Sequence, residues 1–160
     1  MDQLSEILEH PLYQQHRKAI DDCEKDRYFC GHDTQHFLDV ARIGYIYVLE
    51  HHLPISKAVV YAYAFLHDIG RDVEYNGGEA HDLASLKIAK LILKTSSYTE
   101  KDQALILSAI GQHRDGSQGD SDTFEGLMYR ADKQSRACYQ CEAEAACHWA
   151  KHKKNMTIEV

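Results

Sequence analysis

The sequence predicts an all-α fold in a single domain that spans residues 1–160. Apolar residues recur with the helical period throughout the chain, and strand-like alternation of polar and apolar residues is absent. A length of 160 residues suits one domain, and a hydrophobic share of 44% is enough for one core. Because no internal repeat or linker divides the chain, we expect one compact helical unit.

Two helices are expected in the first third of the chain. Pro11 suits the first turn of a helix that runs to about Asp26. A second helix covers residues 34–50, where spacings of i, i+4, i+7 and i+11 place four side chains on one face: His36, Val40, Ile43 and Tyr47. This inward face therefore carries a histidine among apolar residues.

The most apolar helix is expected between Pro54 and Gly70. It contains eight consecutive apolar residues, Val59–Leu66, which is typical of a helix at the centre of a domain. The pair His67-Asp68 follows this run directly. Burying two such groups is costly unless they are paired or coordinated, so the pair is a candidate for metal chemistry.

The second half of the chain predicts four more helices around two polar turns. Asn76-Gly77-Gly78 indicates a turn, the capping-box spacing at residues 97–100 indicates a helix start, and residues 114–122 form a polar loop. The expected helices cover residues 80–93, residues 97–112, residues 123–136, and a last polar stretch to about Lys153 that packs on the outside.

Composition excludes several classes of protein. The chain has 18 Lys and Arg against 25 Asp and Glu, so a net charge of −7 argues against binding a nucleic-acid polymer. No apolar run approaches the roughly 18–20 residues of a membrane helix, and the acidic N-terminus lacks a signal-peptide pattern. We therefore expect a cytoplasmic protein, whose odd number of five cysteines argues against a disulfide framework.

Several predicted helices place a potential metal ligand on an inward face or at a helix end. His36 lies on the apolar face described above, and Asp132 follows Met128 by one turn. His81 and His113 lie at the ends of the helices expected at residues 80–93 and 97–112. Each alone is more often a satisfied core histidine or a capping aspartate. Together, six ligands could hold one or two divalent metals: His36, His67, Asp68, His81, His113 and Asp132.

The order and context of these residues resemble the HD-domain superfamily of metal-dependent phosphohydrolases. The resembling segments are HFLDVARI around His36, FLHDIGR around His67-Asp68 and MYRADKQSR around Asp132, within about residues 28–137. HDLASLKIAKLIL and AIGQHRDG are similar to second-metal segments of bacterial HD-type hydrolases that cleave dinucleoside tetraphosphates, and of HD-GYP phosphodiesterases. The chain departs from these groups in lacking a GYP tripeptide and in having only 12 residues between Asp68 and His81.

The resemblance implies an HD-type helical domain with a defined metal chemistry. His36, His67, Asp68 and Asp132 would bind a first metal, and Asp68 would bridge to a second metal held by His81 and His113. Metal-activated water would then cleave a phosphate ester or phosphoanhydride of a small substrate, for which we expect a nucleotide. Iron, manganese, cobalt, nickel and magnesium all remain open, with iron or manganese favoured.

Candidate residues for substrate binding lie close to these ligands in the sequence. Four cations are candidate phosphate clamps, although each could equally be a solvated surface charge: Arg71, Arg114, Lys133 and Arg136. His32 lies one turn before His36 and is expected to support a ligand or contact substrate. A homodimer is possible. Six further histidines are expected at the surface: His10, His16, His51, His52, His148 and His152.

Two other functions and one other metal site stay open. An HD-type oxygenase similar to myo-inositol oxygenase would use the same six ligands for di-iron chemistry, and an HD fold can also serve as a non-catalytic binding or sensory module. Cys138-x-x-Cys141 with Cys147 could bind zinc or an iron–sulfur centre. Because this stretch is rich in Ala and Glu and predicts helix, small core thiols are the default interpretation.

Overall fold

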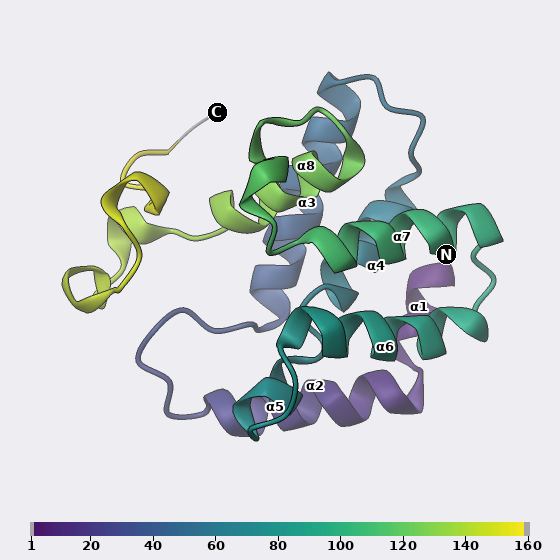
Figure 1. Cartoon of the computed structure of the whole chain (residues 1–160), viewed down its shortest axis with the longest axis horizontal. Coiled ribbons are helices and arrows are strands. Elements are labelled where there is room, and N and C mark those ends of the chain that lie inside the picture. The colour runs from purple at the N-terminus through teal and green to yellow at the C-terminus, as the bar shows by residue number, and fades with distance from the viewer. Residues whose placement is uncertain (1, 159–160) are drawn as a thin grey trace.

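The computed structural model describes residues 2–158, which form helices and no strand. This confirms the predicted all-α class (Figure 1). The α-helices are α1 (Asp2–Leu8), α2 (Pro11–Glu24), α3 (Thr34–Glu50), α4 (Lys57–Leu66), α5 (Arg71–Tyr75), α6 (His81–Lys94), α7 (Glu100–Gln112) and α8 (Phe124–Gln134). Short 3₁₀ helices are η1 (Gly116–Asp120), η2 (Cys138–Gln140), η3 (Glu144–Ala146) and η4 (Lys151–Lys153).

Helix α4 is the centre of the molecule, as its apolar run predicts. Every residue of Val59–Leu66 except Tyr61 is buried. Helix α3 packs on α4 and α8, while α7 packs on α4, α6 and α8. Helix α2 packs on α5 and α6, on the lower side of the bundle in Figure 1. One hydrophobic cluster joins these helices, so their inward ends face a common interior.

Side-chain oxygens cap the starts of four α-helices. In each case an oxygen of the residue before the helix accepts a hydrogen bond from a backbone N–H in the first turn, which satisfies a donor that the helix leaves free. The capping residues are Asp33 for α3, Ser56 for α4, Thr99 for α7 and Thr123 for α8. The α3 cap bonds to the N–H of His36 and so fixes the turn that carries this histidine.

The turn after α4 is pressed against α6. The sequence predicts helix as far as Gly70, whereas α4 ends at Leu66 and the turn leads directly into α5, which sequence analysis missed. A Cβ at Gly70 would lie 2.4 Å from the backbone nitrogen of Ser85 in α6, and the Gly70 N–H donates to Ser85 Oγ at 2.9 Å. Glycine therefore allows the close approach that brings His67-Asp68 to the start of α6.

The largest error of the sequence analysis concerns the C-terminal segment, residues 137–158. The sequence predicts a helix to about Lys153, but the structure has only the short turns η2, η3 and η4 there. Ala143 is the one buried residue among 137–158. An Ala- and Glu-rich stretch without an apolar face gains little from packing, so its helix propensity alone does not produce a helix. Sequence analysis also missed α1 at the N-terminus.

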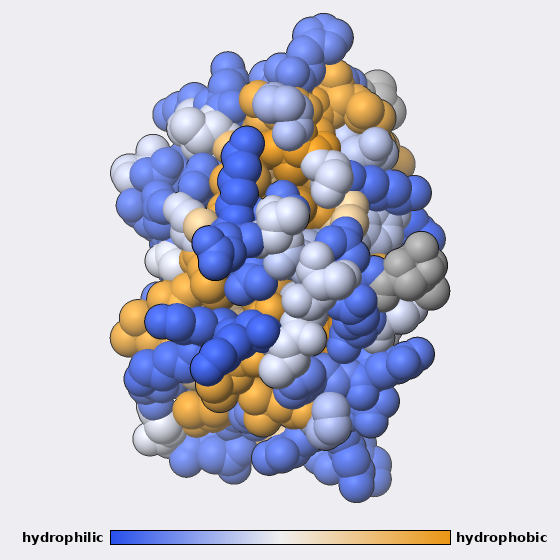
Figure 2. Space-filling view, turned by 90° about the vertical axis from the view of Figure 1, so that its right-hand side faces the viewer, coloured by the Kyte–Doolittle hydropathy of each residue, from blue (hydrophilic) through white to orange (hydrophobic). Residues whose placement is uncertain are grey.

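The outer surface is mostly hydrophilic. Figure 2 shows a face turned 90° from the view of Figure 1, on which polar side chains dominate and apolar atoms appear as separate patches between them. Among the described residues, no helix has both the length and the apolar character needed to cross a membrane.

Candidate metal centre

The six predicted metal-ligand side chains meet in the interior of the bundle. They come from five helices, because His36 and Asp132 project inward from α3 and α8 while the others lie at the start of α6 or directly after α4 and α7. All six are buried: His36, His67, Asp68, His81, His113 and Asp132. Their ligand atoms form two groups within metal-binding range, His36–His67–Asp68–Asp132 and Asp68–His81–His113.

The first group surrounds the Nε2 atom of His67. This atom lies 3.2 Å from Asp68 Oδ2 and 3.6 Å from Asp132 Oδ1. His36 Nε2 lies 3.5 Å from Asp132 Oδ1 and 3.8 Å from Asp68 Oδ2. Two imidazole nitrogens and two carboxylates thus face one point, which is a ligand set that divalent transition metals accept.

The second group uses the other oxygen of Asp68. Asp68 Oδ1 lies 3.4 Å from His81 Nε2 and 3.7 Å from His113 Nε2. Because Oδ2 faces the first group and Oδ1 faces the second, one carboxylate joins both. This is the arrangement that a carboxylate bridging two metals requires.

The hydrogen bonds of His67 and His113 are more typical of metal-binding histidines than of histidines packed in a hydrophobic core. His67 Nδ1 donates to the backbone oxygen of Ala64 at 2.9 Å, and His113 Nδ1 donates to that of Ile110 at 2.7 Å. Each bond leaves Nε2 to face the cluster, and both Nε2 atoms are buried with no hydrogen-bond partner. Buried polar atoms are rarely left unsatisfied, and a metal ion bound by the cluster would satisfy both nitrogens.

The charges of the cluster favour a cation at its centre. Burial lowers the pKa of both His36 and His81 to about 4, so these imidazoles are neutral at neutral pH, as metal ligands must be. Burial also opposes protonation of His67, but the negative charges of Asp68 and Asp132 outweigh it and raise the pKa of His67 to about 9. The two carboxylates therefore attract positive charge at this point.

The carboxylates remain ionised despite their burial. Burial alone would raise the pKa of Asp68, yet the nearby positive charges of His67 and Arg71 hold this pKa well below its usual range. Burial likewise opposes ionisation of Asp132, and Lys133 and His67 outweigh it. Both side chains thus present negative oxygens to the cluster.

Outer hydrogen bonds orient several of these histidines, and sequence analysis missed the residues that make them. Ser135 Oγ lies 3.0 Å from His36 Nδ1 and donates to the backbone oxygen of Asp132, so it accepts from the histidine. Glu74 pairs with Nδ1 of His81. Such partners fix the ring orientation of a metal-binding histidine. Neither residue stands out in the sequence, because its role depends on contacts between separate helices.

His32 is buried beside the cluster, as expected for a supporting or substrate-contacting group. Its Nδ1 lies 2.5 Å from Glu24 Oε1, which also accepts from the hydroxyl of Tyr75 at 2.6 Å. Its Nε2 lies 3.6 Å from Asp68 Oδ2. Burial lowers the pKa of His32, so a neutral ring faces Asp68 from the open side of the cluster.

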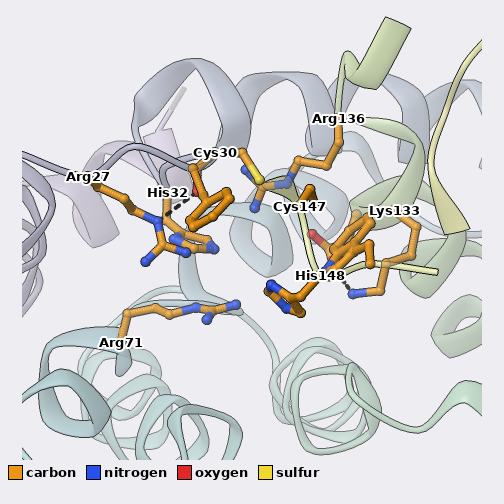
Figure 3. Close-up of a pocket in the computed structure, with 11 residues that line it drawn as sticks. Arg27, Cys30, His32, Arg71, Lys133, Arg136, Cys147 and His148 are labelled. Atoms are coloured by element: carbon orange, nitrogen blue, oxygen red, sulfur yellow. Dashed lines mark hydrogen bonds and ion pairs between the residues drawn. The ribbon is translucent and has the colours of Figure 1, made fainter. Parts of the chain in front are cut away.

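A cavity of about 140 Å³ lies next to the metal-ligand cluster, and cations line it. Four positive side chains line this cavity, and Figure 3 shows them around it: Arg27, Arg71, Lys133 and Arg136. Arg71 Nε lies 2.9 Å from Asp68 Oδ1, and Lys133 Nζ lies 2.6 Å from Asp132 Oδ2. Two of the four cations, Arg71 and Lys133, are therefore in direct contact with the predicted ligand carboxylates.

The structure places the other predicted clamp elsewhere. Arg114 is half-exposed and pairs with Asp82 at 3.2 Å, outside the residues that line this cavity. His148, expected only as a surface residue, does line it, together with the rings of Phe29 and Trp149. His16, also expected at the surface, is mostly buried and lies 2.9 Å from Asp72.

Comparison with known proteins agrees with this site. The model of the HD domain family matches residues 34–155, which is more than half of the chain. The chain therefore belongs to the HD domain family. It is also similar to an uncharacterized protein of Clostridium beijerinckii, with 42% identity over 158 residues that cover 99% of each chain. No solved structure gave a match.

Proposed function

We propose that the protein is a metal-dependent phosphohydrolase that cleaves a phosphate ester or phosphoanhydride of a small nucleotide. The observation that carries this proposal is the juxtaposition of two parts. One is a buried pair of ligand groups that share Asp68, and the other is a cavity lined by four cations. Membership of the HD domain family supports the hydrolase class.

The residues would divide the work as follows. His36, His67, Asp68 and Asp132 would hold one divalent metal, and Asp68, His81 and His113 would hold a second. When bound, such metals acidify a water molecule so that it can supply hydroxide near neutral pH. Asp68 would keep the two sites at a fixed separation, and the outer partners Ser135 and Glu74 would keep the rings of His36 and His81 oriented.

The cations would bind and orient the phosphate. Arg71 and Arg136 are planar donors that can bind two phosphate oxygens at once, and Lys133 offers a mobile point charge. Arg136 lies 3.2 Å from His36 Nε2, so its guanidinium reaches the edge of the ligand cluster. Phosphate bound between these groups would lie beside the metal ligands, where positive charge stabilises the charge that develops during hydrolysis.

Two aromatic rings beside the cations support a nucleotide rather than a simple phosphate as the substrate. The rings of Phe29 and Trp149 line the same cavity as the cations. Aromatic side chains stack on nucleobases irrespective of base sequence, so a base could lie here while the phosphates face Arg71 and Arg136. Dinucleoside polyphosphates and mononucleotides are the two substrate sets to test first.

The direct test measures the products formed by protein reconstituted with manganese or ferrous iron, the two favoured metals. Nucleotide products are separated by chromatography, because a dinucleoside polyphosphate is cleaved into two nucleotides, and inorganic phosphate is measured for the monophosphates. The panel contains dinucleoside polyphosphates and nucleoside monophosphates, assayed without oxygen. Turnover that requires added metal and disappears in the Asp68→Asn variant would support the proposal. The proposal would be overturned in favour of an HD-type oxygenase if no member of the panel is hydrolysed and the iron-loaded protein catalyses an oxygen-dependent reaction.

The cation-lined cavity favours phosphate chemistry over the oxygenase, because four cations suit an anionic substrate.

We also propose that the protein is located in the cytoplasm. All five cysteines are free thiols, which a reducing compartment maintains.

A further inference from the structure

The C-terminal segment, residues 137–158, lacks the packing that normally holds a segment of this length. Its regular structure is limited to the three-residue turns η2, η3 and η4, and Ala143 is its one buried residue. Hydrogen bonds from the Asn155 side chain to the backbone oxygens of Lys133 and Arg136 attach its end to α8 and the residues just after it. Long segments without secondary structure of their own are uncommon in compact domains, and small units with little apolar burial often depend on disulfides or a structural metal.

Four of the five cysteines lie around one cavity between this segment and the rest of the molecule. Cys30, from the loop between α2 and α3, lines a cavity of about 90 Å³ together with three cysteines of the segment: Cys138, Cys141 and Cys147. The fifth, Cys23, is exposed on α2 and does not line it. Thus cysteines more than 100 positions apart in the chain line one cavity.

We propose that Cys30, Cys138, Cys141 and Cys147 form a second, separate metal site with four thiolate ligands. Such a ligand set takes a single zinc ion or an iron–sulfur cluster. On binding, each thiol would release its proton to solvent and bind the metal as thiolate. The site would tie the C-terminal segment to the loop before α3, and it uses none of the ligands of the buried histidine–aspartate cluster.

The surroundings of this cavity suit a negatively charged metal–thiolate complex. Arg136 and Lys154 line it, and Lys154 Nζ is held in place by Glu144, with Oε1 at 2.7 Å and the backbone oxygen at 2.8 Å. Four thiolates outweigh the two positive charges of a zinc ion, so cationic neighbours stabilise the complex. The rings of Phe29 and Trp149 also line the cavity and would shield it from water.

Metal binding would draw the two segments closer together. Among residues 2–158, three or more potential ligand atoms lie within 4.8 Å of one another only in the histidine–aspartate cluster. Four sulfurs around one zinc lie about 3.8 Å apart, as tetrahedral bonds of about 2.3 Å require. The short turns that carry Cys138, Cys141 and Cys147 have few packing contacts to break, so they can close on an ion.

The site would also form a wall of the substrate cavity. Cys30 and Cys147 line both cavities, and His148 and Trp149 follow Cys147 directly. A metal bound by the thiolates would therefore fix the position of Trp149 beside the cations. In Figure 3, Cys30 and Cys147 lie close to Arg136, which also lines both cavities.

A test that does not depend on catalysis uses the absorption of thiolate–metal bonds. The protein is purified without chelator or affinity metal, analysed for zinc, iron and acid-labile sulfide, and then reloaded with cobalt. Thiolate ligands give cobalt an intense near-ultraviolet charge-transfer band that histidine and carboxylate ligands do not give. The Cys138→Ser/Cys141→Ser variant should lose this band, whereas the matched control Cys23→Ser should keep it.

The metal analysis distinguishes a zinc ion from an iron–sulfur cluster. One zinc per chain that disappears in the double variant indicates a zinc site, and equal iron and sulfide that disappear indicate an iron–sulfur cluster. Either result supports the proposal, even if the histidine–aspartate cluster proves inactive. Wild-type protein that gives no cobalt–thiolate band and holds no iron and sulfide that the double variant loses would overturn it, as would a band that survives in the double variant.

A second measurement on the wild-type protein covers the case in which the double variant fails to fold. The native protein is treated with an alkylating reagent, and modified thiols are counted by mass spectrometry. With metal bound, we expect Cys23 alone to react rapidly, and after removal of metal by a chelator all five thiols should react. Rapid alkylation of all five thiols in zinc-loaded protein and in anaerobically iron- and sulfide-loaded protein would contradict the site.

Discussion

Asp68 is the residue on which the two halves of the proposed metal centre depend. Its two oxygens face different histidine pairs, at 3.2 Å and 3.8 Å on one side and at 3.4 Å and 3.7 Å on the other. A carboxylate in this position offers one negative oxygen to each metal. An amide of the same shape has a single oxygen, so it cannot replace both contacts.

We therefore expect Asp68→Asn to lose most bound metal and to reduce kcat/KM by at least about 100-fold, as loss of a metal-organising group does. Metal analysis and the kinetics of product formation, measured as nucleotides or inorganic phosphate, give the two effects. The matched control is Asp72→Asn, which changes a buried carboxylate that pairs with His16 instead of the cluster. Equal metal content in the Asp68 variant and the wild type would contradict the bridging role.

Arg136 and Arg114 test which cations bind substrate. Arg136 lines the cavity, while Arg114 pairs with Asp82 outside it. Arg136→Ala should raise KM by about 10-fold or more, because a charge-assisted phosphate contact contributes about 1.5–3 kcal/mol. Arg114→Ala should leave KM nearly unchanged. Steady-state kinetics with the preferred substrate decide this, and equal effects of the two changes would rule out the assignment.

At the residue scale, the sequence predicted the six clustered side chains because each lies on an apolar helix face or at a helix end. In the structure, these residues keep the positions on helix faces and at helix ends that the sequence indicates. The outer partners Ser135, Glu74 and Glu24 could not be predicted, because each contacts its histidine across a loop or from another helix. Arg114 shows the same limit, since adjacency to His113 in sequence does not bring its side chain into the cavity.

At the scale of elements, the turn between α4 and α5 sets the position of His67 and Asp68. Gly70→Ala should lower the free energy of unfolding by about 1–3 kcal/mol, because its Cβ would overlap the backbone of α6. The matched control is Gly111→Ala within α7, where the nearest atom lies 3.8 Å from the new Cβ. This control should stabilise the protein by about 0.5–1 kcal/mol.

Urea unfolding of both variants tests this prediction about the turn. A Gly70→Ala protein as stable as the wild type would show that the turn can move away from α6 at no cost. The metal ligands after α4 would then not depend on this close approach.

The C-terminal segment contributes Trp149 to the substrate cavity. Trp149→Ala should raise KM for a nucleotide by about 10-fold, since stacking on one base contributes about 1–3 kcal/mol. It should leave KM for the same phosphate group without a base nearly unchanged. The control Tyr139→Ala removes an exposed aromatic ring of the same segment that does not line this cavity. A similar rise in KM for both substrates would contradict base stacking.

Sequence patterns predicted the long helices and failed for the short and irregular ones. Helices α3, α4, α6 and α7 each have an apolar face or a capping residue within the sequence. Helix α5 has five residues and depends on packing against α2 and α6. For residues 137–158, high helix propensity was misleading, because no apolar face holds a helix there.

For the molecule as a whole, the net charge is negative, whereas four side chains around the cavity are positive. The chain carries a net charge of −7, yet four cations converge on the cavity beside the metal ligands. Local positive charge and bound metal would attract a phosphorylated substrate irrespective of the overall sign.

The number of metal ions per chain tests the central claim most directly. It is measured in the Cys138→Ser/Cys141→Ser background, so that thiolate-bound metal does not contribute, with and without His81→Ala and His113→Ala. A dinuclear centre predicts two metals per chain that fall to about one when both histidines are removed. One metal per chain, unchanged by their removal, would contradict the bridged centre and assign His81 and His113 to another role.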